Sequence, residues 1–237
     1  MIRTILVVGL LMSFVSCNSQ DNCSSTTAQK QDTAQKAECP VDTTPTEPQT
    51  PGEPETPVEE PIEEPQIDVP HEASLFDANL SLNEFDSKDE IKVMKAIEII
   101  KKVIKTSEFR NRVINFTYNG KKTYVDNDGF TNEQIYQKLI DGAETLKPEV
   151  DHEMDLELEL YYSSRNTVGY TYANVLRIWM NTKYFDVYTP AEVAGNVFHE
   201  WTHKLGFDHA SSYSVSRDSS VPYALGYIVE ELGKKFE

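Results

Sequence analysis

The most informative stretch of the sequence is His199-Glu200-Trp201-Thr202-His203-Lys204-Leu205-Gly206-Phe207-Asp208-His209, which follows the pattern H-E-x-x-H-x-x-G-x-x-H. The chain has five histidines, and three of them fall here. His199 and His203 are four residues apart, so on a helix they share one face. Gly206 can take the left-handed conformation that ends a helix, which would return His209 toward the same point. The spacing therefore predicts three imidazoles around one metal ion.

The chemistry of this pattern favours Zn²⁺. Three neutral imidazoles leave a fourth position open, which is the arrangement of catalytic rather than structural zinc. Glu200 lies beside a ligand and can take a proton from a water in that position. The alternative is a surface helix with chance histidines, which the combination of a Glu, a Gly and a third His at fixed spacing argues against.

The surrounding pattern predicts an α+β domain with a small mixed sheet. Thr189-Pro190-Ala191-Glu192 combines a cap, a proline at the first helical position and a Glu three residues after the cap, which predicts a helix to about Leu205. Residues 154–161 alternate apolar and acidic, as in a half-buried strand. Residues 170–172 and 175–185 read as further strands.

Helices are expected earlier in the same domain, which we place at residues 73–237. Ser87-Lys88-Asp89-Glu90 has the pattern of a capping box and opens an amphipathic helix. A short helix is expected over 107–115, and a loop with Asn-Gly and Asp-Gly turns over 117–129. Thr131 is the expected cap of a helix that runs to about Leu146, before Pro148.

The eleven residues resemble the active-site motif of the metzincin clan of zinc metallopeptidases. The resemblance implies a zincin-like fold, His199, His203 and His209 as ligands, and Glu200 as general base of a zinc metalloendopeptidase. It also implies that the strand before the active-site helix, here 175–185, is an edge strand that holds a protein or peptide substrate by main-chain pairing.

The chain departs from the clan pattern after the third ligand. Metzincins carry a methionine in a turn there, whereas no Met follows Met180 in this chain. Val221-Pro222-Tyr223 could form the apolar turn beneath the metal instead. Tyr223 or Tyr227 could supply a phenol that assists catalysis, the alternative being that both are packing or surface residues.

The N-terminus has the features of an export signal. Arg3 precedes a short apolar run from Ile5 to Val15, too short to span a membrane. The run ends at Phe14-Val15-Ser16-Cys17, which resembles a bacterial lipobox. We expect residues 1–16 to be a signal peptide and Cys17 to carry a lipid anchor, with an ordinary signal peptide as the alternative. Asn18 after the cysteine favours the outer membrane, on the periplasmic or surface side.

Residues 17–72 are expected to be a disordered Pro/Glu-rich tether. Nine of the twelve prolines lie between Pro40 and Pro70, and fourteen acidic residues but no Lys or Arg lie between Lys36 and Lys88. The net charge of -17 argues against nucleic-acid binding. Cys23 and Cys39 lie in the tether and could pair in an oxidising compartment.

Three functions are compatible with these patterns. The first is a lipid-anchored zinc metallopeptidase of the bacterial cell envelope. The second is a non-catalytic zinc-binding envelope lipoprotein that acts as a binding module. The third is hydrolysis of a non-peptide amide, such as a cell-wall crosslink.

Overall fold

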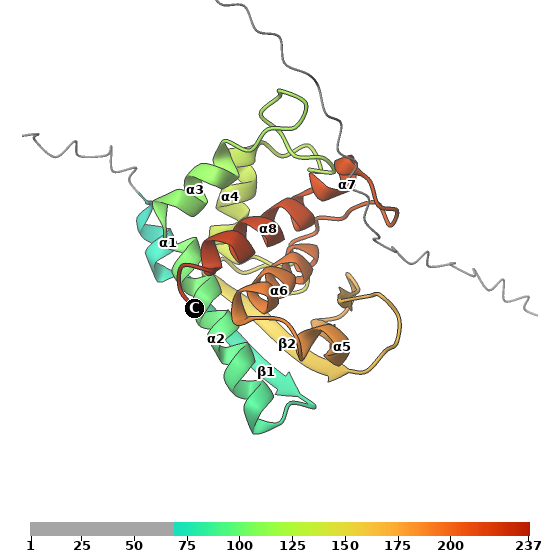
Figure 1. The fold of residues 1–237 in the computed structure, drawn as a ribbon. Coiled ribbons are helices and arrows are strands. Elements are labelled where there is room, and N and C mark those ends of the chain that lie inside the picture. Colours follow the sequence, from blue (N-terminus) through green and yellow to red (C-terminus); the bar gives the residue numbers. More distant parts are fainter. Residues whose placement is uncertain (1–68) are drawn as a thin grey trace, which may run out of the picture. The chain divides into compact units, whose positions relative to one another are not determined.

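A computed structural model describes residues 69–237 of the chain (Figure 1). In chain order its elements are α1 (His71–Leu75), β1 (Asp77–Asn83), α2 (Ser87–Ile104), α3 (Ser107–Ile114), α4 (Asn132–Asp141), β2 (Glu153–Tyr161), β3 (Gly169–Thr171), β4 (Arg177–Asn181), α5 (Thr182–Phe185), α6 (Pro190–Lys204), α7 (Val215–Asp218) and α8 (Val221–Gly233). The fold is α+β, as the sequence predicted.

The four described strands form one mixed sheet in the order β1-β2-β4-β3. Strands β1, β2 and β4 are parallel, whereas β3 runs antiparallel to β4 and forms an edge. Leu158 pairs with Ile178 and lies on the buried face, whereas Glu157 and Glu159 lie on the other face. This alternation is the one that the acidic and apolar residues of β2 predict.

In the described part of the chain, the long helices pack on one face of the sheet. Helix α2 packs against β1 and α6, and α6 packs against β3 and β4. Helix α8 lies on α6 and forms the layer farthest from the sheet (Figure 1). The helix that carries the histidine motif is therefore enclosed between the sheet and α8.

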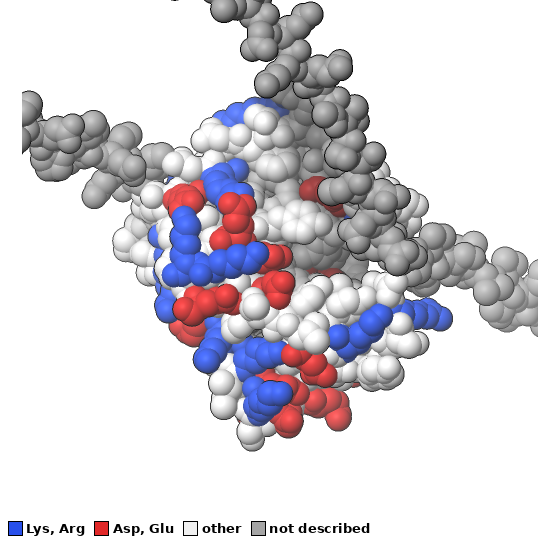
Figure 2. Space-filling view, viewed as in Figure 1, with Lys and Arg blue, Asp and Glu red and all other residues white. Residues whose placement is uncertain are grey.

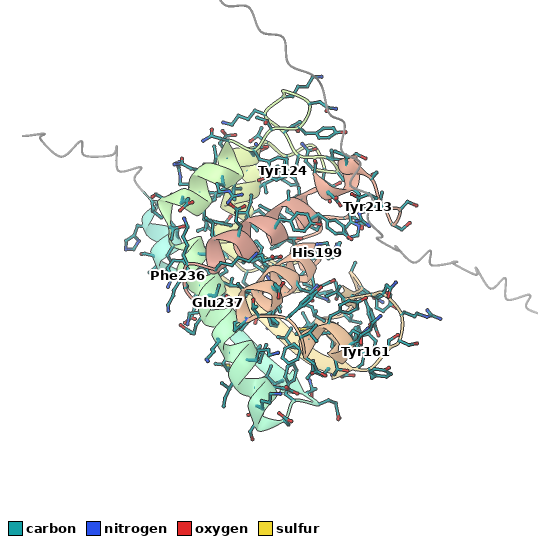
Figure 3. The ribbon with its side chains drawn as sticks, in the orientation of Figure 1. Tyr124, Tyr161, His199, Tyr213, Phe236 and Glu237 are labelled. Carbon is teal, nitrogen blue, oxygen red and sulfur yellow. The ribbon has the colours of Figure 1, made fainter. Side chains whose placement is uncertain are left out.

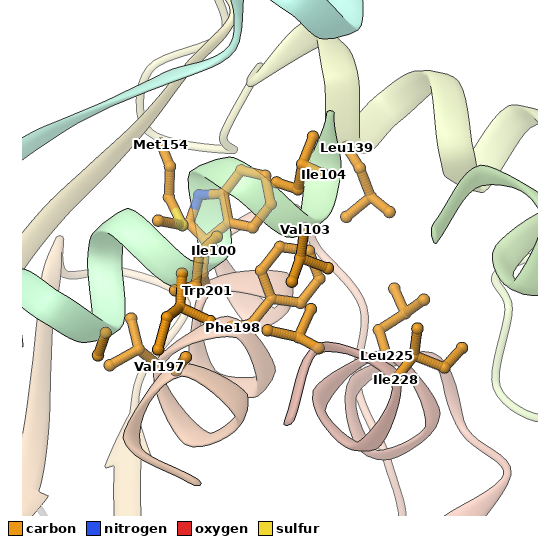
Figure 4. Close-up of a cluster of buried hydrophobic side chains, with 14 of the residues drawn as sticks. Ile100, Val103, Ile104, Leu139, Met154, Val197, Phe198, Trp201, Leu225 and Ile228 are labelled. Carbon is orange, nitrogen blue, oxygen red and sulfur yellow. The ribbon is translucent and has the colours of Figure 1, made fainter. Parts of the chain in front are cut away.

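The centre of the core is built around the motif helix itself. Trp201 is fully buried, and its ring meets Phe76 and Phe198 at centroid distances of 5.8 and 5.3 Å. Figure 4 shows Trp201 and Phe198 among aliphatic side chains of α2, α4 and α8. The Trp201 indole Nε1 donates to Glu144 Oε1 at 2.6 Å, which satisfies its one donor. Loss of such a buried aromatic side chain typically costs about 3–5 kcal/mol, so this packing holds α6 firmly.

Ion pairs join the outer helices on one face of the molecule, where basic and acidic side chains are interspersed (Figure 2). Arg112 of α3 pairs with Glu231 of α8 at 2.8 Å, and Lys235 pairs with Glu108 at 2.6 Å. These side chains are largely exposed, so each pair contributes about 0–1 kcal/mol.

Several predicted helix boundaries are confirmed. Helix α6 has the predicted capping box at Thr189 and Glu192, and Gly206 has a φ of 94° just beyond its end. Helix α3 and the turns at Asn119-Gly120 and Asp128-Gly129 also lie where the pattern placed them, with positive φ at all four turn residues.

Three local predictions are wrong. The cap of α2 is Asp86, whose side chain accepts from the Lys88 and Asp89 amides, so the helix has no capping box at Ser87. Helix α4 ends at Asp141, because Gly142 takes the left-handed conformation with a φ of 70°. Residues 175–185 are not one edge strand: β4 is interior, its chain continues into α5, and the edge belongs to β3.

The predictions for the N-terminal region concern residues that the structure does not describe. The signal peptide, Cys17, Cys23, Cys39 and nearly all of the tether lie before residue 69. Within residues 69–237, none of the helices combines the length and the apolar character needed to cross a membrane.

Candidate metal centre

Helix α6 places the first two histidines on one face. His199 and His203 lie one turn apart with ring centroids 5.2 Å from each other. The same helix buries Val197, Phe198 and Trp201, so its apolar side fixes its rotation. Figure 3 shows His199 on α6 beside α8.

The loop after Gly206 brings the third histidine to the same point. The His209 ring lies 5.1 Å from the His199 ring and 4.9 Å from the His203 ring. One nitrogen from each of the three rings lies within 4.8 Å of the others. The structure thus brings together the three residues that the motif spacing predicted.

Hydrogen bonds to main-chain carbonyls set the tautomers of two rings. His203 Nδ1 lies 2.7 Å from the Phe207 oxygen, and His209 Nδ1 lies 3.0 Å from the Ala210 oxygen. A carbonyl oxygen only accepts, so each Nδ1 carries the proton and each Nε2 keeps its lone pair. The His199 ring is in turn hydrogen-bonded to the backbone of Pro222. Such outer contacts are the ones that orient imidazole ligands.

The distances and charge states fit a zinc ion. His199 Nε2 and His209 Nε2 are 3.2 Å apart, close to the ~3.4 Å expected for two nitrogens on a tetrahedral zinc with bonds near 2.1 Å. Burial, together with the neighbouring His203 and His209, holds the pKa of His199 well below its usual value. Burial also lowers the pKa of His203. Both rings are therefore neutral near pH 7, as zinc ligands must be.

Glu200 follows His199 directly on α6 and lies in a dry environment. Its residue is 4 % exposed, and burial raises the pKa of its carboxyl group to about 8, against the opposing charge of Lys204. Its side chain lies against β3, because a Cβ added to Gly169 would come within 3.2 Å of Glu200 Oε1. A carboxyl group with a pKa near neutrality is suited to both accept and donate a proton.

The two candidate tyrosines have different positions. The Tyr223 ring lies 4.4 Å from the His199 ring and 4.6 Å from the His209 ring, and the Arg217 guanidinium lies 4.3 Å over it. Tyr227 is one turn farther along α8, 50 % exposed, and its ring is 6.0 Å from that of Tyr223. Partial burial raises the pKa of Tyr227 to about 12. Tyr223 therefore borders the triad, whereas Tyr227 lies beyond it.

The segment expected to form an apolar turn instead begins a helix. Val221 and Pro222 are buried and occupy the first turn of α8 after Ser220. The segment still lies against the histidine triad, because the Pro222 backbone is hydrogen-bonded to the His199 ring. A proline at the start of a helix has no amide to leave unsatisfied, which suits this position.

Sequence reasoning missed the glycines that let α8 approach the motif helix. A Cβ on Gly226 would lie 2.9 Å from the Gly195 carbonyl oxygen and 3.1 Å from His199 Cβ. A Cβ on Gly195 would lie 2.8 Å from the Gly226 oxygen. Gly195 and Gly226 are 31 positions apart in the chain, so no local pattern reveals their contact.

Sequence reasoning also missed Lys204. It follows His203 directly and is 4 % exposed. Burial lowers its pKa to about 8, against the charges of Glu200 and Glu157. Its position one turn after Glu200 on the same helix face was the available signal.

Comparison with known families, with curated proteins and with solved structures finds no match to this chain. The interpretation of the site therefore depends on its own geometry and on the eleven-residue motif.

Proposed function

We propose that the protein is a zinc-dependent metallopeptidase with a zincin-like catalytic domain. The observation that carries this proposal is the convergence of three imidazole nitrogens within 4.8 Å of one another, with the buried Glu200 directly after His199 on the same helix. The resemblance of the motif to that of metzincins supports the same function. So does an edge strand, β3, whose Gly169 lies against Glu200.

The proposed mechanism assigns a distinct task to each group. His199, His203 and His209 would hold a zinc ion, which when bound would act as a Lewis acid that lowers the pKa of water to about 7 and polarises a carbonyl group. Glu200 takes a proton from the attacking water and passes it to the leaving amine nitrogen. Tyr223, which contacts two of the three ligands, donates a hydrogen bond to the oxygen that becomes negative.

Substrate would be held as an extended chain. Within residues 69–237, β3 pairs only with β4, so its other edge is available there for main-chain pairing with a peptide. Strand addition places a peptide along β3, next to Glu200. This arrangement favours a peptide or protein substrate over a small amide.

The domain would act outside the cytoplasm on a lipid anchor at Cys17. The lipobox-like residues 14–17 and the Pro/Glu-rich composition up to residue 72 support an envelope lipoprotein, with the outer membrane favoured by Asn18. Membrane fractionation of the wild type and Cys17→Ser tests this. Retention of the variant in the membrane fraction would contradict a lipid anchor at this position.

The decisive test uses the chain from residue 18 onward and the variant Glu200→Gln. We expect one zinc per chain in both by elemental analysis. Cleavage of a mixed peptide library should fall about 100- to 10,000-fold in the variant, the usual contribution of a general acid–base group. Glu157→Gln, on the open face of the sheet, is the matched control and should cleave normally.

Other outcomes separate the alternatives. One zinc per chain without cleavage of peptides or cell-wall fragments favours the non-catalytic binding module. Cleavage of wall fragments alone favours a non-peptide amide as substrate. Absence of bound zinc would overturn all three functions: the metallopeptidase, the zinc-binding module and the hydrolase of a non-peptide amide.

A further inference from the structure

Lys204 is a buried lysine that binds no carboxylate in the described region. Its Nζ donates to Thr171 Oγ1 and to the carbonyl oxygens of Val175 at 2.6 Å, Arg177 at 3.2 Å and Tyr172 at 3.3 Å. A buried ammonium group is stable only when polar groups replace its water shell. Here all four of these acceptors belong to one hairpin, formed by β3, β4 and the turn between them.

The hairpin and the motif helix meet at a second point. Gly169 and Thr171 are alternate residues of β3, so both face α6. A Cβ at Gly169 would lie 2.9 Å from Asn196 Oδ1 and 3.2 Å from Glu200 Oε1, so these two side chains of α6 reach β3 at this position. Glu200 therefore lies under Gly169, and Lys204 lies under Thr171.

The two contacts have matching spacings. Glu200 and Lys204 are four residues apart on a helix, which is a rise of about 6 Å. Gly169 and Thr171 are two residues apart on a strand, which is about 6.6 Å. The edge strand and the motif helix thus run side by side in a fixed register, with the carboxylate at one contact and the ammonium group at the other.

The Lys204 contact also defines the shape of the turn. Thr171 Oγ1 donates to the Arg177 oxygen at 2.7 Å, so the two ends of the turn are joined to each other as well as to Lys204. Three carbonyl groups of this turn point at one ammonium group. Without that group they would repel one another, and the turn would have to open.

We propose that Lys204 is a positioning residue, which sets the register of the peptide-binding edge strand β3 relative to the metal centre. This inference rests on the proposed function. It deepens that function by naming the substrate as an extended peptide that needs several residues of pairing along β3. A displacement of about 1 Å at the reacting bond can reduce the rate about 100-fold, so the register matters for catalysis.

The test compares the cleavage of two substrates by the protein that begins at residue 18. One is a peptide of about ten residues, long enough to pair along β3 at about 3.3 Å per residue. The other is a blocked dipeptide with the same scissile bond, too short to pair. Lys204→Met should lower kcat/KM about 100-fold on the long peptide and less than 3-fold on the dipeptide, with one zinc per chain retained. Lys204→Arg, which restores a cation, should recover part of the loss.

Two further variants complete the design. Thr171→Val removes one acceptor without removing the buried lysine, so it keeps the test valid if Lys204→Met does not fold. It should lower kcat/KM about 10-fold on the long peptide alone. Lys183→Met is the matched control, because Lys183 is exposed and its Nζ binds Asn166 Oδ1 at 2.9 Å. Asn166 lies in the loop that precedes β3, away from the turn that Lys204 contacts. It should behave as the wild type.

Equal losses on both substrates, or no loss on either, would overturn the positioning role. A wild-type protein that cleaves neither substrate would instead overturn the proposed function, and the inference with it. Faster amide hydrogen exchange over 169–171 in Thr171→Val, with exchange over α6 unchanged, is expected alongside the kinetic result. Unchanged exchange over that strand would contradict the anchoring of β3 by this contact.

Discussion

Replacement of Gly226 by alanine should weaken metal binding more than it weakens the fold. The added carbon would lie 2.9 Å from the Gly195 oxygen and 3.1 Å from His199 Cβ, inside the 3.5–4.0 Å of a favourable contact. Neither neighbour is the end of a flexible side chain, so α8 and α6 must separate. His199 would then shift relative to His209, which is carried by a loop.

The expected magnitudes follow from these contacts. Overpacking a tight interface typically lowers the free energy of unfolding by about 1–3 kcal/mol. The higher helix propensity of Ala over Gly raises it by about 1 kcal/mol. We therefore expect a net loss of about 1 kcal/mol in the free energy of unfolding without metal. Disturbed ligand support typically lowers metal affinity about 10- to 100-fold.

The assay is competition with a chromophoric chelator for zinc, together with urea unfolding of the metal-free chain. Gly129→Ala is the matched control, since an added Cβ there has nothing within 4 Å but the φ of 80° strains a side chain. The control should lose stability and keep its zinc affinity. If Gly226→Ala binds zinc as tightly as the wild type, the close crossing of α6 and α8 does not position His199.

Two further predictions concern stability. Burial raises the pKa of Glu144, so its carboxyl group binds a proton more tightly in the folded state. Its contribution to stability is therefore greatest below the unfolded pKa near 4.3 and declines as the pH rises through the folded pKa. Urea unfolding from pH 4 to 8 should show that Glu144→Gln gains stability relative to the wild type as the pH rises; a constant difference would contradict this. Thr189→Ala removes the cap of α6 and should cost about 1 kcal/mol by thermal unfolding, whereas no change would mean that the capping box at Thr189 and Glu192 contributes little.

Features fixed by residues close in the chain could be predicted from the sequence. The cap at Thr189 and the left-handed Gly206 depend on neighbours within four positions, and both are confirmed. The helical spacing of the motif likewise placed His199, His203 and His209 together.

Features that depend on distant partners could not be predicted. Strand β1 was missed because its pairing partner β2 lies about 76 positions later, as in the Leu80–Leu156 pair. Helix α4 was extended too far because its end is set by Gly142, where a Cβ would lie 2.3 Å from the Glu153 oxygen. The edge strand was misplaced for the same kind of reason, since β3 reaches its position through contacts with α6 that span about 30 residues.

Contacts with residues outside the eleven-residue motif help to hold His203 and His209 in place. His203 is anchored through Phe207, which is buried against Phe130 with ring centroids 6.0 Å apart. His209 is held by bonds to its own neighbours, Asp208 and Ala210, and by the Tyr223 ring of α8. The residues on both sides of His209 are exposed, so the long-range support of this loop comes from the Tyr223 ring of α8 and the His199 and His203 rings of α6.

A metal ion would therefore add bonds to the existing ring contacts between the His209 loop and α6. It would join the His209 loop to α6, and at a concentration 1,000 times its Kd it would stabilise the fold by about 4 kcal/mol. Pro222 of α8 also contacts His199, so the positions of both His199 and His209 depend on α8. The eleven residues supply the atoms that would bind a metal ion, and we expect the packing of α8 on α6 to determine how tightly they would bind it.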